Sequence, residues 1–338
     1  MKFLMSTLFC ISMLCLLLIY LRSPHQRFHS QWDVERLPHG VFSMPELPPG
    51  PVRIGILGEN STAGDREGVS FNKEVVERLL AVLKKKDVQA IFGTGNIVSG
   101  YGEESIFAQR LKEFSQLYVK QLGQVPFFPA MGIYELVSSQ AGKDFRSTFQ
   151  LQNVLVLEGS AIAYTVAIGP AFFVVLPSDR YDAEKNAVMP TFNLDMMEWL
   201  DRVLQQAEKK YPYRFAIGHE PAFPIAGVTF GHFSIHPEHR DEFWKILVKN
   251  RVLAYFAADD RHFDRSNRYG VWQIISGGNS REEEENRSTL SFYHCLLLIV
   301  PDNVSQPPQI EVLDELGNVQ DNVELTPNTS PLFEFHIS

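Results

Sequence analysis

The sequence predicts an α/β fold in which helices cover a sandwich of two β-sheets. Three observations support this fold class. Short apolar runs alternate with segments of helical periodicity in the first half, and the second half repeats this rhythm with more strands. In addition, 45% of the residues are hydrophobic, and no linker-like stretch interrupts residues 51–325. These residues are therefore expected to form one domain.

The first half of that domain reads as strand, helix, strand, helix, strand. Val52–Leu57 is a short apolar run that ends before a glycine, as expected of a buried strand. The remaining elements are predicted as a helix over 71–86, a strand over 88–92, a helix over 105–120 and a strand over 125–129. In sheets of this kind, functional residues collect on the loops after the carboxyl ends of the strands.

The second half contains more strands. Three strands at 154–157, 163–168 and 172–176 are expected to form an antiparallel series. Helices are predicted at 194–209 and 239–248, and further strands at 214–217, 252–256, 271–276 and 291–299. A hairpin turn is predicted around 314–318, where the sequence is Asp-Glu-Leu-Gly-Asn.

The N-terminal segment predicts a membrane anchor or a signal peptide. Residues 3–20 form an uncharged, mostly apolar run that is near the lower limit for spanning a bilayer and long for a signal-peptide core. A buried core helix is the alternative. We therefore expect residues 1–22 to place the body outside the cytoplasm, either membrane-anchored or secreted. Residues 23–50, which are polar and then proline-rich, are predicted as a linker, and residues 326–338 as a tail.

The charge balance argues against a nucleic-acid partner. The chain has 31 basic and 40 acidic residues, a formal charge of −9. Binding to nucleic-acid phosphates requires a basic surface, which this composition does not favour.

Sequons and cysteines add limited information. Four N-x-[ST] tripeptides, at Asn60, Asn286, Asn303 and Asn328, fit a secreted glycoprotein, although such tripeptides also arise by chance. Cys295 is the only cysteine in the predicted domain, so no disulfide can form within it, and it is expected to be a core residue.

Five strand ends carry stretches that resemble the motifs of one known family. They read IGILGENS at 54–61, AIFGTGNIVSG at 90–100, FPAMGIYE at 128–135, FAIGHEPAF at 215–223 and VLAYFAADDRHFDRS at 252–266. Their order and spacing resemble the calcineurin-like metallophosphoesterases, especially the purple-acid-phosphatase-like branch, over roughly residues 50–325. The resemblance implies a four-layer α/β/β/α sandwich. In active members, two divalent metals at the strand ends clamp a phosphate ester and activate water.

The chain departs from the family at most ligand positions. Glu59 stands where the resemblance implies an aspartate, and Asn96 where it implies the carboxylate that bridges both metals. Only His219 keeps the implied residue type. The remaining replacements are Ser61 for a histidine, Ile133 for an asparagine ligand, Tyr134 for a catalytic histidine, and Asp259 and Arg261 for two histidines.

These departures predict a degenerate site that holds no metal pair and no other cofactor. Asn96 is neutral and cannot supply a bridging charge, and Arg261 places a cation where a metal would sit. Asp260 could instead pair with Arg261 and neutralise the site. The expected function is a catalytically inactive, extracytoplasmic binding or scaffold module, whose partner is an unknown protein or a phosphate-bearing ligand.

Two alternatives stay open for this site. In the first, the protein is an active phosphoesterase for phosphate monoesters or diesters. A single Fe, Mn or Zn ion would then be held by Glu59, His219 and Asp259, with or without Asn96, and Tyr134 or Asp260 would serve as the acid. In the second, Arg261, Arg265 and His219 bind an anion without hydrolysis, since guanidinium suits phosphate.

A histidine cluster lies elsewhere in the sequence, at His232, His236 and His239. Histidines three residues apart share a helix face, so a second metal site is conceivable there. In the resembled family this stretch is a loop leading into a helix, which favours a simple surface cluster.

Overall fold

The structure is a computed structural model that describes residues 41–43, 47, 49–61, 70–100, 104–137, 139–151, 154–157, 161–182, 184–185, 187–189, 192, 194–224, 236–260, 262–277 and 292–326. The chain divides into two compact units, residues 1–39 and 40–338, and all the described residues lie in the second. The predicted anchor or signal segment, 1–22, therefore lies outside them. Within the described ranges, no helix is both long and apolar enough to cross a membrane.

The first sheet is built around three parallel strands, β2 (Val52–Leu57), β3 (Ala90–Gly93) and β4 (Phe127–Pro129). Antiparallel strands extend it beyond β2 in the order β14 (His294–Val300), β15 (Gln309–Asp314) and β16 (Val319–Glu324). The predicted hairpin at 314–318 joins β15 and β16.

The second sheet is mixed. Its parallel centre consists of β7 (Ala171–Val175), β10 (Tyr213–Ile217), β11 (Ala254–Ala257) and β13 (Val271–Ser276). Antiparallel pairing adds β6 (Ile162–Ile168) next to β7, β5 (Leu155–Val156) next to β6, and β12 (Phe263–Arg268) next to β13. At the other edge, β1 (Val41–Ser43) pairs with β6 in parallel. A separate hairpin consists of β8 (Arg180–Asp182) and β9 (Ala187–Met189).

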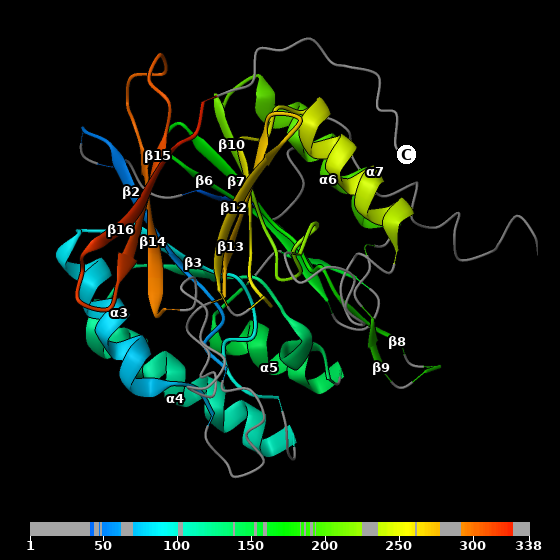
Figure 1. Ribbon diagram of the computed structural model, residues 1–338. Helices are drawn as coiled ribbons and strands as arrows, with labels where there is room; N and C mark the ends of the chain where they lie inside the picture. Colours follow the sequence, from blue (N-terminus) through cyan, green and yellow to red (C-terminus); the bar gives the residue numbers. More distant parts are fainter. Residues whose placement is uncertain are drawn as a thin grey trace, which may run out of the picture. The chain divides into compact units, whose positions relative to one another are not determined.

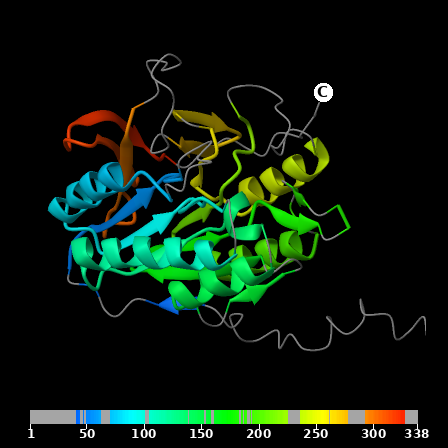
Figure 2. The same ribbon diagram turned by 90° about the horizontal axis from the view of Figure 1, so that it is seen from below.

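The helices form the outer layers of the second unit. Figure 1 shows α3 (Lys73–Lys85) and α4 (Glu104–Leu122) beside the first sheet, and α6 (Leu194–Glu208) and α7 (Pro237–Lys249) beside the second. Figure 2 shows the same separation from below. A short 3-10 helix, η1 (Ile133–Leu136), leads from β4 towards α5 (Ser139–Thr148).

Side-chain alternation along β7 explains why the sheet has helices on one face and the other sheet on the opposite face. Phe172 and Val174 belong to the apolar cluster shared with α6 and α7, whereas Phe173 and Val175 belong to the cluster shared with the first sheet. Successive side chains of a strand point to opposite faces, so one apolar run serves both cores. Between the sheets, the rings of Phe92 and Phe173 stack with their centroids 4.4 Å apart.

The predicted four-layer α/β/β/α sandwich is therefore confirmed. Among the described elements that were not predicted, β12 and α5 lack an apolar pattern and read FDRSNR and SQAGKDFRST. The short elements η1, β8 and β9 were also not predicted. β1 falls inside the segment predicted as a linker.

Cys295 is fully buried in the core, as predicted. Of the sequons, Asn60 is also fully buried, whereas Asn303 is exposed. Asn286 and Asn328 lie outside the described residues.

Candidate functional site

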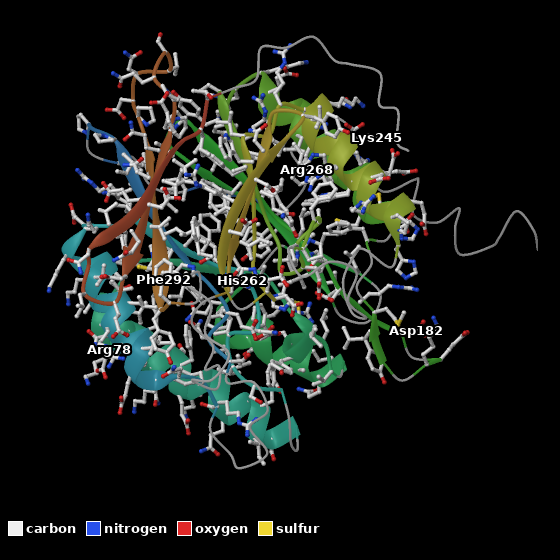
Figure 3. The ribbon with its side chains drawn as sticks, viewed as in Figure 1. Arg78, Asp182, Lys245, His262, Arg268 and Phe292 are labelled. Atoms are coloured by element: carbon white, nitrogen blue, oxygen red, sulfur yellow. The ribbon has the colours of Figure 1, made fainter. Side chains whose placement is uncertain are left out.

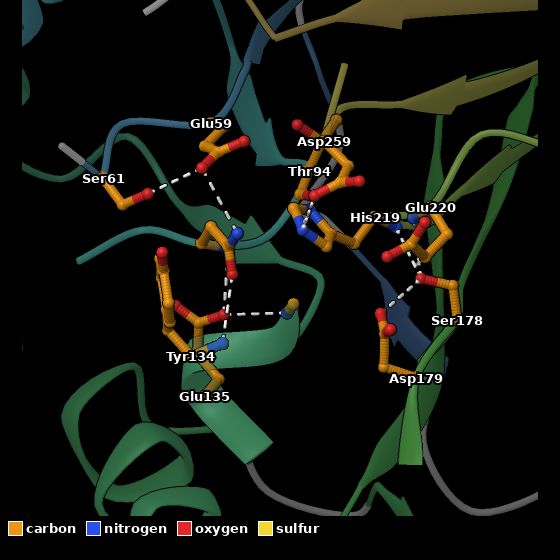
Figure 4. A network of polar contacts seen from close by, with 12 residues as sticks. Glu59, Ser61, Thr94, Tyr134, Glu135, Ser178, Asp179, His219, Glu220 and Asp259 are labelled. Carbon is orange, nitrogen blue, oxygen red and sulfur yellow. Dashed lines mark hydrogen bonds and ion pairs between the residues drawn. The ribbon is translucent and has the colours of Figure 1, made fainter. Parts of the chain in front are cut away.

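The candidate site lies where loops from both sheets meet. Glu59 follows β2, Asn96 follows β3, His219 follows β10 and Asp259 follows β11. The carboxyl ends of parallel strands lie at one edge of a sheet, and Figure 4 shows these loops converging. One ligand atom each from Glu59, His219 and Asp259 lies within 4.8 Å of the other two. The structure thus brings together all four predicted ligand positions.

His219 is the centre of this cluster and is fully buried. Its Nδ1 atom lies 2.9 Å from the carbonyl oxygen of Thr94, which follows β3 in the other sheet. A carbonyl only accepts hydrogen bonds, so Nδ1 carries the proton and Nε2 faces the acids. Nε2 is buried, makes no hydrogen bond to a residue that the structure describes, and lies 3.6 Å from Oδ1 of Asp259, an ion-pair distance.

The charges around His219 favour its protonated form. Burial alone lowers the pKa of the imidazole, but the carboxylates of Asp259, Asp179 and Glu59 outweigh it and raise the pKa to about 10. Without a metal ion, the imidazolium is therefore a cation that balances these acids in the described part of the site.

Asn96 is bound into the site by every polar group it has. Its Oδ1 accepts a hydrogen bond from the backbone N–H of Tyr134 at 3.1 Å, which turns Nδ2 towards Oε1 of Glu59 at 3.3 Å. Ser61 Oγ donates to the same oxygen of Glu59 at 2.7 Å. The side of the amide that faces Glu59 is thus a donor, which offers no lone pair to a metal. The backbone of Asn96 is left-handed, at φ +49°, a conformation that asparagine tolerates better than most residues.

Glu135 holds the loops after β3 and β4 together, a role that the sequence did not reveal. Its carboxylate accepts hydrogen bonds from the backbone N–H groups of Gly132 at 2.8 Å, Asn96 at 2.9 Å and Ile97 at 2.8 Å. Burial raises the pKa of Glu135 although these bonds and His219 act in the opposite direction. The only sequence signal for this role was the place of Glu135 at the end of the FPAMGIYE stretch.

Two more acids border the site and were also missed. Asp179 follows β7 and Glu220 follows His219, and both are buried. The hydroxyl of Ser178 accepts from the backbone N–H groups of His219 at 3.1 Å and Glu220 at 2.8 Å, and it donates to Asp179 at 3.0 Å. Burial is the main cause that raises the pKa of both carboxyls. Repulsion from Asp259 adds to it for Asp179, and repulsion from Asp179 and Asp259 adds to it for Glu220. No strand or helix pattern marks them in the sequence, because their position depends on how the two loops meet.

The other predicted site residues have varied surroundings. Asp259 has a left-handed backbone, at φ +59°, and Asp260 beside it is buried. Tyr134 is half-buried in η1. Arg261 lies outside the described residues. Arg265 forms a two-pronged contact with Asp321 of β16, from Nε at 2.6 Å and Nη2 at 3.2 Å, so an anion there would have to displace that carboxylate.

The residues fit one cation better than two. A bridged pair of dications needs a charged ligand where the donor face of Asn96 lies, and Ile133 offers no donor atom. One cation is compatible with the site, because the unbonded Nε2 of His219 faces Asp259, and Glu59 lies within the same ligand distance.

The loop after His219 is fixed by Phe223. Gln273 of β13 makes hydrogen bonds of 2.8 Å to both its backbone N–H and its carbonyl. The guanidinium of Arg268, labelled in Figure 3, lies 4.2 Å from the centre of its ring, and the ring of Trp244 packs edge-on against it. These contacts hold the far end of the His219 loop on the sheet.

No protein-family model matches the sequence, and no curated protein sequence is significantly similar to it. Solved structures share the fold, and two of them illustrate the similarity to this chain. One is GAP50, described as the anchor in the inner membrane complex of Plasmodium, with 14% identity, a TM-score of 0.58, and coverage of 83% of this chain and 90% of that one. The other is a dimetal phosphatase from Danio rerio, with 13% identity, a TM-score of 0.58, and coverage of 83% and 100%.

Proposed function

We propose that this chain, which has the calcineurin-like metallophosphoesterase fold, is a non-catalytic binding or scaffold module that lacks the two-metal centre. The observation that carries the proposal is the hydrogen bonding of Asn96. Its amide links Glu59 to the backbone of Tyr134. Hydrogen bonds within the chain therefore occupy the position at which a bridging carboxylate would lie. The imidazolium of His219 supplies the balancing charge.

The module is proposed to act outside the cytoplasm, anchored through residues 3–20 or secreted. The apolar N-terminal run supports this location. The likeness to GAP50, described as an anchor in a membrane complex, is compatible with a scaffolding role but shows only the fold of this chain. The proposed partner is a protein or a phosphate-bearing ligand.

Metal analysis of the purified full chain tests the proposal. We expect fewer than two equivalents of Fe, Mn and Zn together, and no hydrolysis of an aryl phosphate above background. Two bound equivalents with chelator-sensitive hydrolysis would overturn it.

The Asn96→Asp variant sharpens this test, because it restores a charged oxygen facing Glu59. Two carboxylates at that distance repel without a cation, so this variant should be less stable than the wild type in a chelator and should be stabilised more by Mn²⁺. Asn322→Asp, at an exposed position of β16, is the matched control, and Mn²⁺ should change its stability no more than it changes that of the wild type.

A second candidate function is a phosphoesterase with one metal ion. The convergence of Glu59, His219 and Asp259 favours it, and these three residues would hold the ion. A bound divalent ion would polarise a phosphoryl oxygen. Asp260 and Tyr134 stay predictions for the acid of this enzyme. Arg261, Arg265 and His219 stay predictions for the separate alternative, in which the site binds an anion without hydrolysis.

Hydrolysis of an aryl phosphate separates the two functions. The single-metal enzyme requires one equivalent of metal and activity that is lost both in His219→Ala and in a chelator. Activity that survives either treatment would exclude the single-metal enzyme, and the absence of activity from protein loaded with Fe, Mn or Zn would favour the scaffold.

A further inference from the structure

A second group of metal-ligand side chains lies at the start of α7, and it has no part in the candidate site. One ligand atom each from His236, Glu238 and His239 lies within 4.8 Å of the other two. Nδ1 of His236 is 3.7 Å from Oε1 of Glu238. The two imidazole rings are nearly parallel, with an interplanar angle of 24° and centroids 5.6 Å apart.

The local sequence explains this convergence. His236 occupies the position just before the helix, Pro237 opens the first turn, and His239 lies three residues after His236. Side chains at these two positions lie on the same side of a helix start, where a cap residue normally reaches the third helical residue. His236 makes no such capping bond with its side chain, so the helix start does not use its ring nitrogens.

The distances and donor types match a transition-metal site. With metal–ligand bonds of about 2.0–2.2 Å, two ligand atoms of a tetrahedral zinc ion lie roughly 3.4 Å apart. The 3.7 Å between Nδ1 of His236 and Oε1 of Glu238 is close to that value. Two imidazoles and one carboxylate form a donor set that suits Zn²⁺ and similar divalent transition metals. Three protein ligands leave one coordination position for water.

The surrounding charges must also tolerate a cation. The positive end of the helix dipole opposes one, but the carboxylate of Glu238 in the first turn offsets it. Arg240 is the nearest cation on the helix, and its guanidinium is paired with Asp241 at 2.8 Å. Glu242 adds a further negative charge one turn along.

We propose that His236, Glu238 and His239 form a solvent-accessible site for one divalent cation of the zinc type, independent of the Glu59–His219–Asp259 cluster. The site is proposed irrespective of whether the chain is an enzyme or a scaffold.

Calorimetric titration of the full chain, without a histidine tag, with Zn²⁺ near neutral pH tests this proposal. Loss of even a supporting partner of a metal ligand costs about 10–100-fold in affinity, so His236→Asn and His239→Asn should each weaken binding at least tenfold. Glu238→Gln should also weaken it. Glu198→Gln, which alters an exposed glutamate on α6, is the matched control and should bind Zn²⁺ like the wild type.

The His219→Gln variant separates this site from the candidate site. Zinc binding that persists in His219→Gln and is weakened by His239→Asn supports the proposal. The absence of binding in the wild type, or binding that neither His236→Asn nor His239→Asn changes, would overturn it. Histidine ring ¹⁵N shifts of the wild type give a readout that does not depend on folding of the variants, since Zn²⁺ should move the His236 and His239 signals. Unmoved signals at saturating Zn²⁺ would also overturn the proposal.

Discussion

At the scale of single residues, His219 links the chemistry of the site to the stability of the fold. Its pKa of about 10 in the folded chain lies above the ordinary value of 6.5. The folded state therefore holds the proton more tightly than the unfolded state. The stabilisation is complete below about pH 6.5 and is lost as the pH rises towards 10.

We predict that the free energy of unfolding of the metal-free chain falls as the pH rises through this range. His219→Gln should remove most of that pH dependence, and it should lower stability at pH 6 by about 3–5 kcal/mol, because it leaves buried acids without their cation. Urea denaturation at pH 6, 8 and 10 measures both effects. An unchanged pH dependence in the variant would contradict the assignment of the charge to His219.

Removing the charge of Asp179 should raise the stability of the fold, whereas removing the charge of His219 should lower it. Burial first, and then repulsion from Asp259, raise its pKa, so the ionised form destabilises the folded state. Asp179→Asn keeps the shape and an oxygen that can accept from Ser178. We expect this variant to be more stable than the wild type by about 1 kcal/mol or more at pH 8, with the gain shrinking at acid pH.

Denaturation of Asp179→Asn and the wild type at pH 4 and pH 8 measures this gain. Asp241→Asn serves as the control, because Asp241 lies on α7, away from Asp179 and Glu220, and pairs with Arg240 instead. A variant less stable than the wild type at pH 8 would show that Asp179 is stabilised in its ionised form.

At the scale of elements, the loops after the strands are shaped by glycines that leave no room for a side chain. A Cβ atom on Gly132 would lie 2.6 Å from Oδ1 of Asn96 and 2.9 Å from Cδ2 of His219. A Cβ atom on Gly95 would lie 2.9 Å from Nδ1 of His219. These close approaches let the loops of the two sheets surround one imidazole.

Gly132→Ala should therefore separate the loop after β4 from Asn96. We expect a loss of about 1–3 kcal/mol, the usual cost of an added carbon in a packed interior. Chemical denaturation measures the loss. Ser305→Ala, in an exposed loop between β14 and β15, is the control and should change stability by less than about 0.5 kcal/mol. A Gly132→Ala variant as stable as the wild type would mean that the loop after β4 can move to make room for the added carbon at little cost in free energy.

The elements that the sequence predicted correctly are those with a strong apolar pattern. Val52–Leu57 and Val271–Ser276 have the same bounds in the structure as in the prediction. The polar strand β12 was missed because it pairs with β13 at the edge of its sheet, where no alternation is required. Asn96, His219 and Asp259 were placed in one site from the resemblance, whereas Asp179 and Glu135 were not, because their roles depend on contacts between loops.

At the scale of the whole second unit, the two sheets share one core. The stacked rings of Phe92 and Phe173 lie at its centre, and both side chains are fully buried. Phe92→Ala would open a cavity between the sheets, and we expect it to cost about 3–5 kcal/mol. Unfolding followed by fluorescence and by far-ultraviolet circular dichroism should remain a single transition. The surface change Val119→Ala, on α4, is the control, and two separate transitions in Phe92→Ala would show that the sheets unfold independently.

The hydrogen bond between His219 and the Thr94 carbonyl has an evolutionary consequence. It joins a loop of one sheet to a loop of the other, and it uses Nδ1 and not the Nε2 atom that faces the acids. Selection for a well-folded chain can thus preserve this histidine after selection for turnover has ceased. A surviving ligand residue in such a lineage is evidence of architectural need, and it does not by itself indicate remaining chemistry.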